Sequence, residues 1–218
     1  MNGIWILLLL TLTAALPAII AYCWFRSKKP VVTLPWFLAS VSAGILSFII
    51  AGLAQDLFTM FRQNTPEALF FSIFIRIALV EEASRLVTLI PILRVGKDRQ
   101  KIDRAFGAAL GLAAGLGFAI IESAYHGLTD LNITLLRAFT AAPLHGACGI
   151  RAGKALFLAG QHPQKALLLF LSTVLIHGAY NLMIISPAIP SAFAIFVALA
   201  ALFSSLTYLK DTNDGIFS

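Results

Sequence analysis

The chain has 218 residues, of which 59% are hydrophobic and 12% are charged, and its mean hydropathy is +0.89. These values exclude an ordinary soluble globular domain and predict an all-α, polytopic membrane protein. A bundle of this length has room for about seven spans of roughly 20 residues, so we expect a single integral membrane domain over residues 1–218. The formal net charge is +6, but most basic residues lie between apolar runs, so we expect no nucleic-acid partner.

Seven apolar runs follow one another along the chain, and each is long enough for a transmembrane helix. They cover 4–25, 31–53, 69–93, 105–125, 135–158, 166–185 and 192–208.

Positive charges follow the first and third runs and flank the turn between the fifth and sixth runs. The residues concerned are Arg26, Lys28, Lys29, Arg94, Lys97, Arg99, Lys101, Arg104, Arg151, Lys154 and Lys165. The alternate connections carry little positive charge and contain Asp56, Arg62, Glu67, Asp130 and residues 186–191. Because cytoplasmic loops are enriched in Lys and Arg, this pattern predicts an N-terminus outside and a C-terminus inside.

The third run carries three ionisable residues, Glu81, Glu82 and Arg85. A charge at the centre of a membrane helix costs about 2.5 to 3.5 kcal/mol, so we expect these residues to have a use. Arg85 lies four and three positions after the two glutamates and can pair with either. The other carboxylate is then available to take a proton from water. The alternative is an ion pair that only holds two helices together.

The fourth run places several small residues and one carboxylate on one helical face. Gly107, Gly111 and Gly115 recur every four residues, and Phe118 and Glu122 share their face. Small residues at this spacing let another helix approach closely, so we interpret the glycines as packing residues. Glu122 is therefore predicted to point into the bundle and not toward lipid.

The fifth and sixth runs each contain a histidine. His145 follows Pro143, and His177 lies four residues before Asn181, so imidazole and carboxamide share one helical face. A single membrane histidine is more often a hydrogen-bonding residue between helices than a catalytic one. Two histidines and three glutamates at similar depth, between the outer surface and the middle of the membrane, favour a site. We expect Arg76 and Arg137, nearer the outer boundary, to snorkel toward the membrane surface or to contact lipid.

Several common chemistries have no motif in the chain. There is no HExxH, no GxSxG and no glycine-rich phosphate loop. The two cysteines, Cys23 and Cys148, are too few for a disulfide framework and lie in apolar runs.

Four short motifs resemble those of the PrsW intramembrane proteases, in the same order. They are Glu81-Glu82-Ala83-Ser84-Arg85, Phe118-Ala119-Ile120-Ile121-Glu122, His145-Gly146-Ala147 and His177-Gly178-Ala179-Tyr180-Asn181. The resemblance covers runs three to six, about residues 69–185, and extends to the wider group that includes the CAAX prenyl proteases and bacteriocin-processing or immunity proteins. Two positions depart from the PrsW pattern: Arg85 replaces the usual Lys, and Asn181 is closer to the prenyl-protease branch.

The resemblance implies cleavage of a membrane-anchored protein, such as an anti-sigma factor, on the extracytoplasmic side of a bacterial cell membrane. Lipid and this substrate are the partners it implies. We predict that Glu81 or Glu82 activates a water, that Glu122 and His145 assist, and that His177 and Asn181 stabilise the oxyanion. Arg85 and Phe118 are expected to support them.

The residues leave two mechanisms open, one that uses a metal ion and one that does not. Glu82, Glu122, His145 and His177 are the predicted ligands of a zinc ion, and a metal-free glutamate mechanism needs the same residues. Two non-enzymatic alternatives also remain. Buried Glu and His can form a proton or cation pathway, and a degenerate family member can act as a scaffold or immunity protein.

Overall fold

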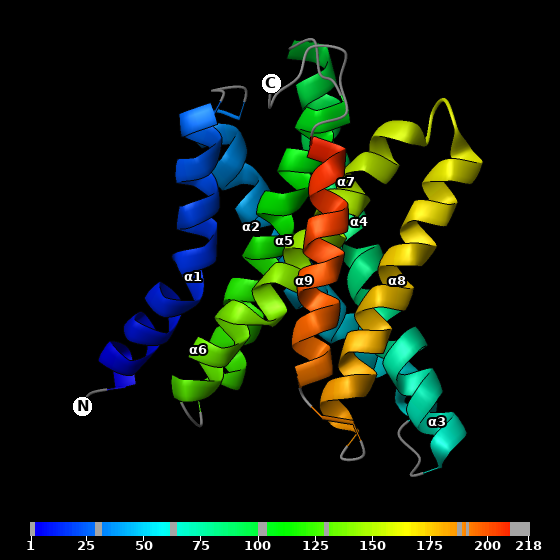
Figure 1. Cartoon of the computed structure of the whole chain (residues 1–218). Coiled ribbons are helices and arrows are strands. Elements are labelled where there is room, and N and C mark those ends of the chain that lie inside the picture. Colours follow the sequence, from blue (N-terminus) through cyan, green and yellow to red (C-terminus); the bar gives the residue numbers. More distant parts are fainter. Residues whose placement is uncertain are drawn as a thin grey trace.

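The computed structural model describes residues 3–28, 32–61, 65–99, 104–128, 131–186, 189–190 and 192–209, which form helices joined by short connections and contain no strand (Figure 1). The predicted all-α class is confirmed. The α-helices are α1 (Gly3–Lys28), α2 (Leu34–Gln55), α3 (Pro66–Phe71), α4 (Val80–Arg99), α5 (Arg104–His126), α6 (Leu131–Phe139), α7 (Ala141–Leu158), α8 (Pro163–Ile185) and α9 (Ala192–Leu206). The 3-10 helices η1 (Asp56–Phe61) and η3 (Thr207–Leu209) and the π-helix η2 (Ser72–Leu79) complete the set.

Helix α5 forms the centre of the bundle. Every residue from Ala105 to Ile120 is buried, and the helix contacts α1, α2, α4, α6 and α7. Its most extensive contact is with α7. The sequence of α5 explains these contacts, because most residues of this stretch are Ala, Gly or Leu, which allow neighbouring helices to approach from several sides.

The α5–α7 contact depends on glycines from both helices. A Cβ at Gly111 would collide with the carbonyl of Gly149, and a Cβ at Gly149 would collide with the carbonyl of Gly111. Gly115 meets the carbonyl of His145 in the same way. The interpretation of the α5 glycines as packing residues is therefore confirmed, and this packing sets the position of His145 relative to α5.

Two of the seven predicted spans differ in detail from the prediction. The third, 69–93, runs through α3, η2 and α4, with eight residues in π-helical conformation. The fifth, 135–158, is wrong as one helix, because Thr140 (φ −120°, ψ −65°) separates α6 from α7. Pro143 occupies the first turn of α7, where its missing N–H leaves no helical hydrogen bond unmade.

Five described helical stretches are long and apolar enough to cross a membrane: Leu8–Ser27, Leu34–Phe58, Ala105–His126, Pro163–Ile185 and Ala192–Leu209. The third and fifth predicted spans are helical but carry more charge, so the count of seven stays a prediction. Large apolar side chains cover the outside of the bundle, among them Leu12, Leu53, Leu168 and Phe203. Such a surface belongs in a bilayer, and the protein is an integral membrane protein.

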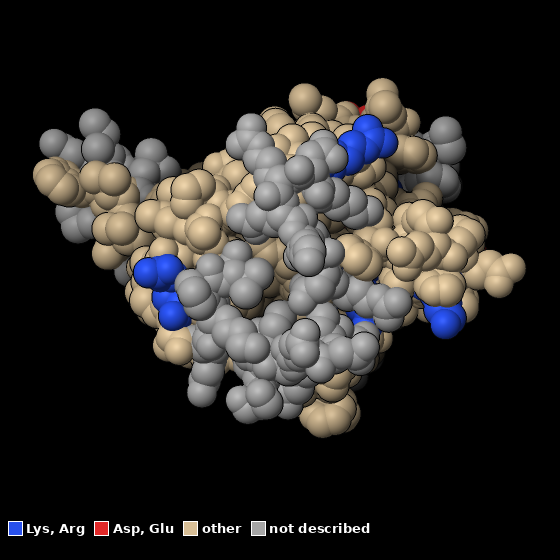
Figure 2. Space-filling view, turned by 90° about the horizontal axis from the view of Figure 1, so that it is seen from above, with Lys and Arg blue, Asp and Glu red and all other residues tan. Residues whose placement is uncertain are grey.

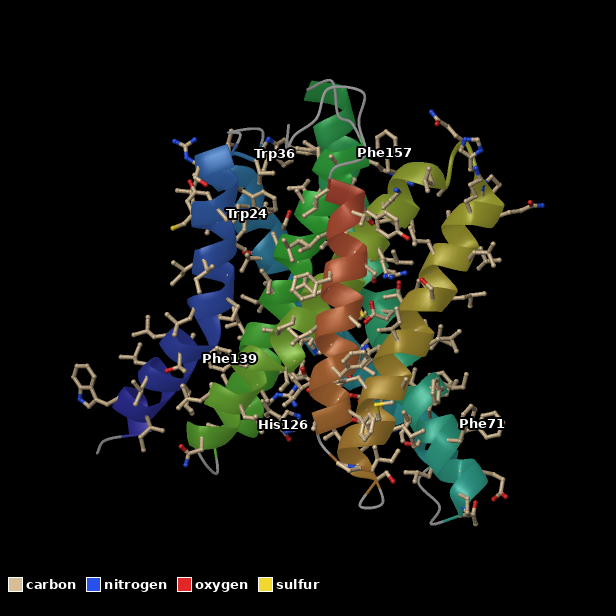
Figure 3. The ribbon with its side chains drawn as sticks, viewed as in Figure 1. Trp24, Trp36, Phe71, His126, Phe139 and Phe157 are labelled. Carbon is tan, nitrogen blue, oxygen red and sulfur yellow. The ribbon has the colours of Figure 1, made fainter. Side chains whose placement is uncertain are left out.

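The two ends of the bundle differ in charge. Helices α1, α4, α7 and α9 end at the top of Figure 1, where α2, α5 and α8 begin. Figure 2 views this end, and nearly all the charged side chains that it shows are Lys or Arg. Trp24, Trp36 and Phe157 lie near the same end, and Phe71 and His126 near the other (Figure 3). Aromatic rings at both ends fit the two membrane interfaces.

The fold therefore brings the predicted basic connections to one end. The orientation of this end toward the cytoplasm stays a prediction. Five of the charged or polar positions on which it depends, Lys29, Arg62, Lys101, Asp130 and Ser191, lie outside the described residues, as does Val31 at the start of the second predicted span.

Candidate functional site

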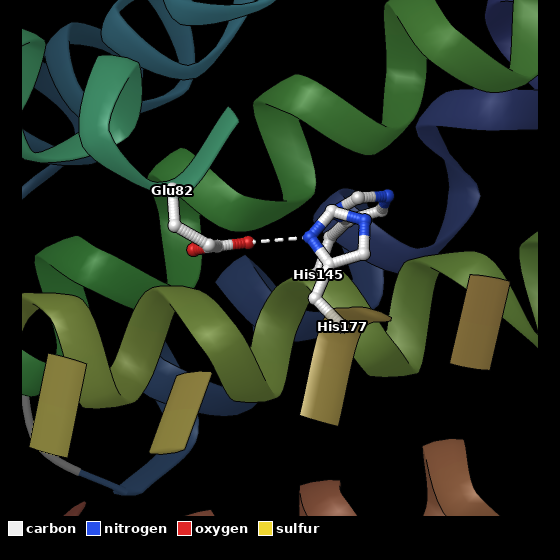
Figure 4. A group of neighbouring side chains, drawn as sticks. All are labelled: Glu82, His145 and His177. Carbon is white, nitrogen blue, oxygen red and sulfur yellow. Dashed lines mark hydrogen bonds and ion pairs between the residues drawn. The ribbon is translucent and has the colours of Figure 1, made fainter. Parts of the chain in front are cut away.

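Glu82 is the buried centre of a polar cluster contributed by several helices. One of its carboxylate oxygens forms an ion pair with Nη1 of Arg85, three positions later on α4. The other oxygen, Oε1, lies 2.8 Å from Nδ1 of His177 on α8 (Figure 4). Glu82 and Arg85 have no exposed surface, and His177 has 1%. Both oxygens of Glu82 are thus fixed by hydrogen bonds.

Arg85 also connects α4 to α7. Its Nη2 lies 3.2 Å from Nδ1 of His145. Because a guanidinium can only donate, Nδ1 accepts and the ring proton lies on Nε2. Nε2 then donates to Oε2 of Glu122 on α5, at 2.7 Å. The ring of Phe118 packs 4.8 Å from the His145 ring and 4.9 Å from Cζ of Arg85, measured to ring centroids.

Glu122 has a second partner that the sequence analysis did not predict. Nη2 of Arg137 on α6 lies 2.5 Å from the same Oε2. The side chains of Arg137 and Glu122 are only 15% and 14% exposed. The expectation that Arg137 contacts lipid is therefore wrong, because the break at Thr140 lets α6 turn this arginine toward the site.

Glu81 has different surroundings from Glu82. Its Oε1 accepts a hydrogen bond of 3.0 Å from Nε2 of Gln55, at the end of α2. Its Oε2 is buried, makes no hydrogen bond, and lies 3.5 Å from Nε2 of His177. Arg76 donates to the backbone carbonyl of Gln55 at 3.1 Å, and its expected snorkelling or lipid contact stays a prediction. A buried carboxylate oxygen without a hydrogen bond is costly and marks a place for a ligand or a water.

The predicted residues do not all join the cluster. Asn181 is half-buried one turn after His177 on α8, and no polar contact links its amide to another described residue. Gln55 and Arg137 belong to the site and were missed. The only signal in the sequence is their polarity at the edge of an apolar run, which ordinary interfacial residues share.

Three residues of the cluster present the donor atoms of a metal site. Glu82, His145 and His177 each offer one ligand atom, and these atoms lie within 4.8 Å of one another. One carboxylate and two imidazoles are a ligand set that zinc uses in enzymes. Glu122, the fourth predicted ligand, lies outside this group of three and binds His145 instead, as a carboxylate behind a metal-binding histidine does.

The cluster lies nearer one end of the bundle. Glu122 is close to the end of α5, His145 is in the second turn of α7, and His177 is two turns before the end of α8. All of these helix ends are opposite the basic end. A family model described as "PrsW family intramembrane metalloprotease" matches residues 32–206, which include every residue of the cluster. No curated protein and no solved structure matches the chain.

Proposed function

Because the chain belongs to the PrsW family of intramembrane metalloproteases, as its four motifs predicted, we propose that it hydrolyses a peptide bond of a membrane-anchored protein with a water that Glu81 activates. An anti-sigma factor is the substrate class that the family resemblance implies. The cell membrane of a bacterium is the proposed location, with the cluster toward the extracytoplasmic side.

The observation that carries this proposal is that Oε2 of Glu81 makes no hydrogen bond to a described residue. A general base needs an oxygen within reach of the proton that it removes. Oε2 of Glu81 is buried and makes no hydrogen bond, while both oxygens of Glu82 are occupied by Arg85 and His177. We therefore assign the base to Glu81 and a fixed, anionic role to Glu82.

The donor set of Glu82, His145 and His177 suits a divalent metal, and we propose zinc, which would replace the hydrogen bonds that Glu82 makes to His177 and that His145 accepts from Arg85. When bound, zinc polarises a carbonyl and activates water for attack. The three donor residues lie on three different helices. Gln55 orients Glu81 and Glu122 orients His145, and neither of these two partners is one of the three donors. Such outer partners fix the direction of the donor atoms.

The remaining residues have roles in proton and charge transfer. As the water oxygen bonds to the scissile carbon, its proton passes to Oε2 of Glu81. The resulting carboxylic acid then gives this proton to the leaving amide nitrogen as the C–N bond breaks. The Asn181 amide, which is on the helical face of His177 and has no polar contact with another described residue, is proposed to donate to the oxyanion.

Cleavage by purified protein in liposomes tests the assignment of Glu81. In Glu81→Gln we expect the cleavage rate of a single-span substrate to fall at least 100-fold, since general-base catalysis contributes about 10² to 10⁴. Glu67→Gln is the matched control, because Glu67 is exposed on α3, away from the cluster. Its rate should stay within twofold. Full activity in Glu81→Gln, with an unchanged melting temperature, would refute the assignment of the base to Glu81, and full activity in Glu82→Gln as well would refute the proposed hydrolysis.

Elemental analysis tests the metal. Purified protein is expected to contain about one zinc per chain, and His177→Ala is expected to contain less than one tenth of that. His162→Ala is the control, since His162 is exposed in the turn before α8. Equal zinc in both variants would remove His177 from the metal site.

A further inference from the structure

An open cavity with three basic side chains in its lining lies at the basic end of the bundle, where α7 ends, α8 begins and α9 passes into η3. Its volume is about 370 Å³, and its lining includes Arg151, Lys154, Lys165 and Tyr208. No acidic residue lines it among the described residues. The residues that act in the proposed hydrolysis are absent from this lining, so the cavity is a separate site.

Arg151 is held in the cavity by neutral groups. Its Nε donates to Oγ of Ser205 at 2.9 Å, and its Nη1 donates to Oγ of Ser172 at 3.0 Å. Its Nη2 donates to Oγ of Ser204 at 2.9 Å. The three hydroxyl groups accept from three of the five guanidinium N–H groups but carry no negative charge. A cation within a membrane protein is costly until an anion lies near it.

Two more cations surround the same space. Nζ of Lys154 lies 4.0 Å from the centroid of the Tyr208 ring, and Cζ of Arg151 lies 5.6 Å from it. Lys154 is buried, whereas Lys165 is exposed at the rim. Three positive side chains on one small cavity repel one another and attract an anion.

The surface beside the cavity is apolar. Leu158 and Leu169 line its wall, and Leu168 at its edge is 67% exposed. Leu171 and Leu175 continue the exposed row along α8 at helical spacing. A ligand with a negative head and an apolar tail can therefore contact both parts at once, which free phosphate cannot.

We propose that this cavity binds the phosphate-bearing headgroup of an anionic membrane lipid, with an acyl chain along the row Leu168, Leu171 and Leu175. The headgroup lies among the three cations, and Tyr208 stands at the level of the membrane interface. Basic pockets between membrane helices are known to take lipid phosphates in this way.

Native mass spectrometry of the purified full-length protein in detergent tests this site. The protein is titrated with phosphatidylglycerol and, in parallel, with phosphatidylcholine of the same acyl chains. Wild type is expected to bind phosphatidylglycerol at least tenfold more tightly. Lys165→Gln and Arg151→Gln should each weaken its binding about fivefold. Arg94→Gln, an exposed arginine at the same end but outside the cavity, is the control and should change binding less than twofold.

Three results would overturn the proposal. The first is equal binding of the two lipids, and the second is a loss in Arg94→Gln as large as in Lys165→Gln, which would indicate general surface charge. The third is displacement of phosphatidylglycerol by 10 mM inorganic phosphate, which would assign the cavity to free phosphate. Lys165→Gln decides the test if Arg151→Gln does not fold, because Lys165 is exposed.

Discussion

Glu81 and Glu82 are adjacent in the chain but have different tasks in the proposed mechanism. Glu82 is fixed by Arg85 and His177, so its charge and position are constant. Glu81 is fixed at one oxygen by Gln55, and its other oxygen makes no hydrogen bond to a described residue. Gln55 is therefore a positioning residue, because it orients the carboxylate that accepts the proton without touching the substrate.

Loss of the Gln55 amide should slow the chemical step. A hydrogen bond to a charged group contributes about 1.5 to 3 kcal/mol. We expect Gln55→Met, which keeps the length of the side chain, to lower kcat about 10- to 100-fold and to leave KM within twofold. Steady-state cleavage of a single-span substrate in liposomes measures both constants.

Gln161→Met is the matched control, since Gln161 lies exposed in the turn after α7. Its kcat should equal that of wild type. A Gln55→Met enzyme with unchanged kcat, or with a rise in KM alone, would show that Gln55 does not orient the base.

Individual site residues differ in how visible they are in the sequence. Glu81, Glu82 and Arg85 stand out because charges inside an apolar run are costly and rare. Gln55 and Arg137 lie near the ends of predicted runs, where polar residues cost little. Their roles depend on contacts with Glu81 and Glu122 from other helices, and the pattern of a single run does not contain these contacts.

At the scale of helices, the contact between α5 and α7 has little space to spare. A Cβ at Gly111 would overlap the backbone of Gly149, which cannot move as a side-chain tip can. We expect Gly111→Ala to destabilise the protein by about 1 to 3 kcal/mol, the usual effect of overpacking. Denaturation in detergent, monitored by the loss of the helical circular dichroism signal, measures the change in the free energy of unfolding.

Gly52→Ala on α2 is the control for intrinsic helix propensity, since a Cβ there meets nothing within 4 Å. It should be neutral or stabilising by up to about 1 kcal/mol. A shift of equal sign and size in both variants would mean that close packing of α5 on α7 does not limit stability.

The helices could be predicted from apolar runs, but their irregular parts could not. Seven runs gave the order of the helices because each apolar stretch must satisfy its backbone within the membrane. The π-helix η2 and the break at Thr140 have no comparable signal. A Cβ at Gly178, next to His177, would overlap the Phe74 ring of η2, so contact with α8 accompanies this irregular segment. Wide helical turns of this kind often lie at functional sites.

At the scale of the whole molecule, the positions of charge predict an orientation. With Cys23 and Cys148 replaced by Ser, a membrane-impermeant maleimide applied to intact cells should label Glu67→Cys on α3. It should label Gln161→Cys only after the membrane is permeabilised. Both positions are exposed, at opposite ends of the bundle.

Labelling of Gln161→Cys but not of Glu67→Cys in intact cells would contradict the predicted orientation and would place the cluster toward the cytoplasm. Labelling of both at equal rates in the permeabilised sample is the control for reactivity. The predicted single domain is consistent with one bundle around α5, and it stays a prediction.

The pairing of Glu82 with Arg85 also concerns how the protein is made. Hydrophobic segments leave the ribosome in order, so α4 enters the lipid before α7 and α8 exist. Each charge that arrives alone costs about 2.5 to 3.5 kcal/mol. Glu82 brings its counter-ion on the same helix, one turn away, whereas His145 and His177 are synthesised later. The newly made α4 can thus remain in the bilayer, with the charge of Glu82 already paired with Arg85, until α7 and α8 are inserted with their histidines.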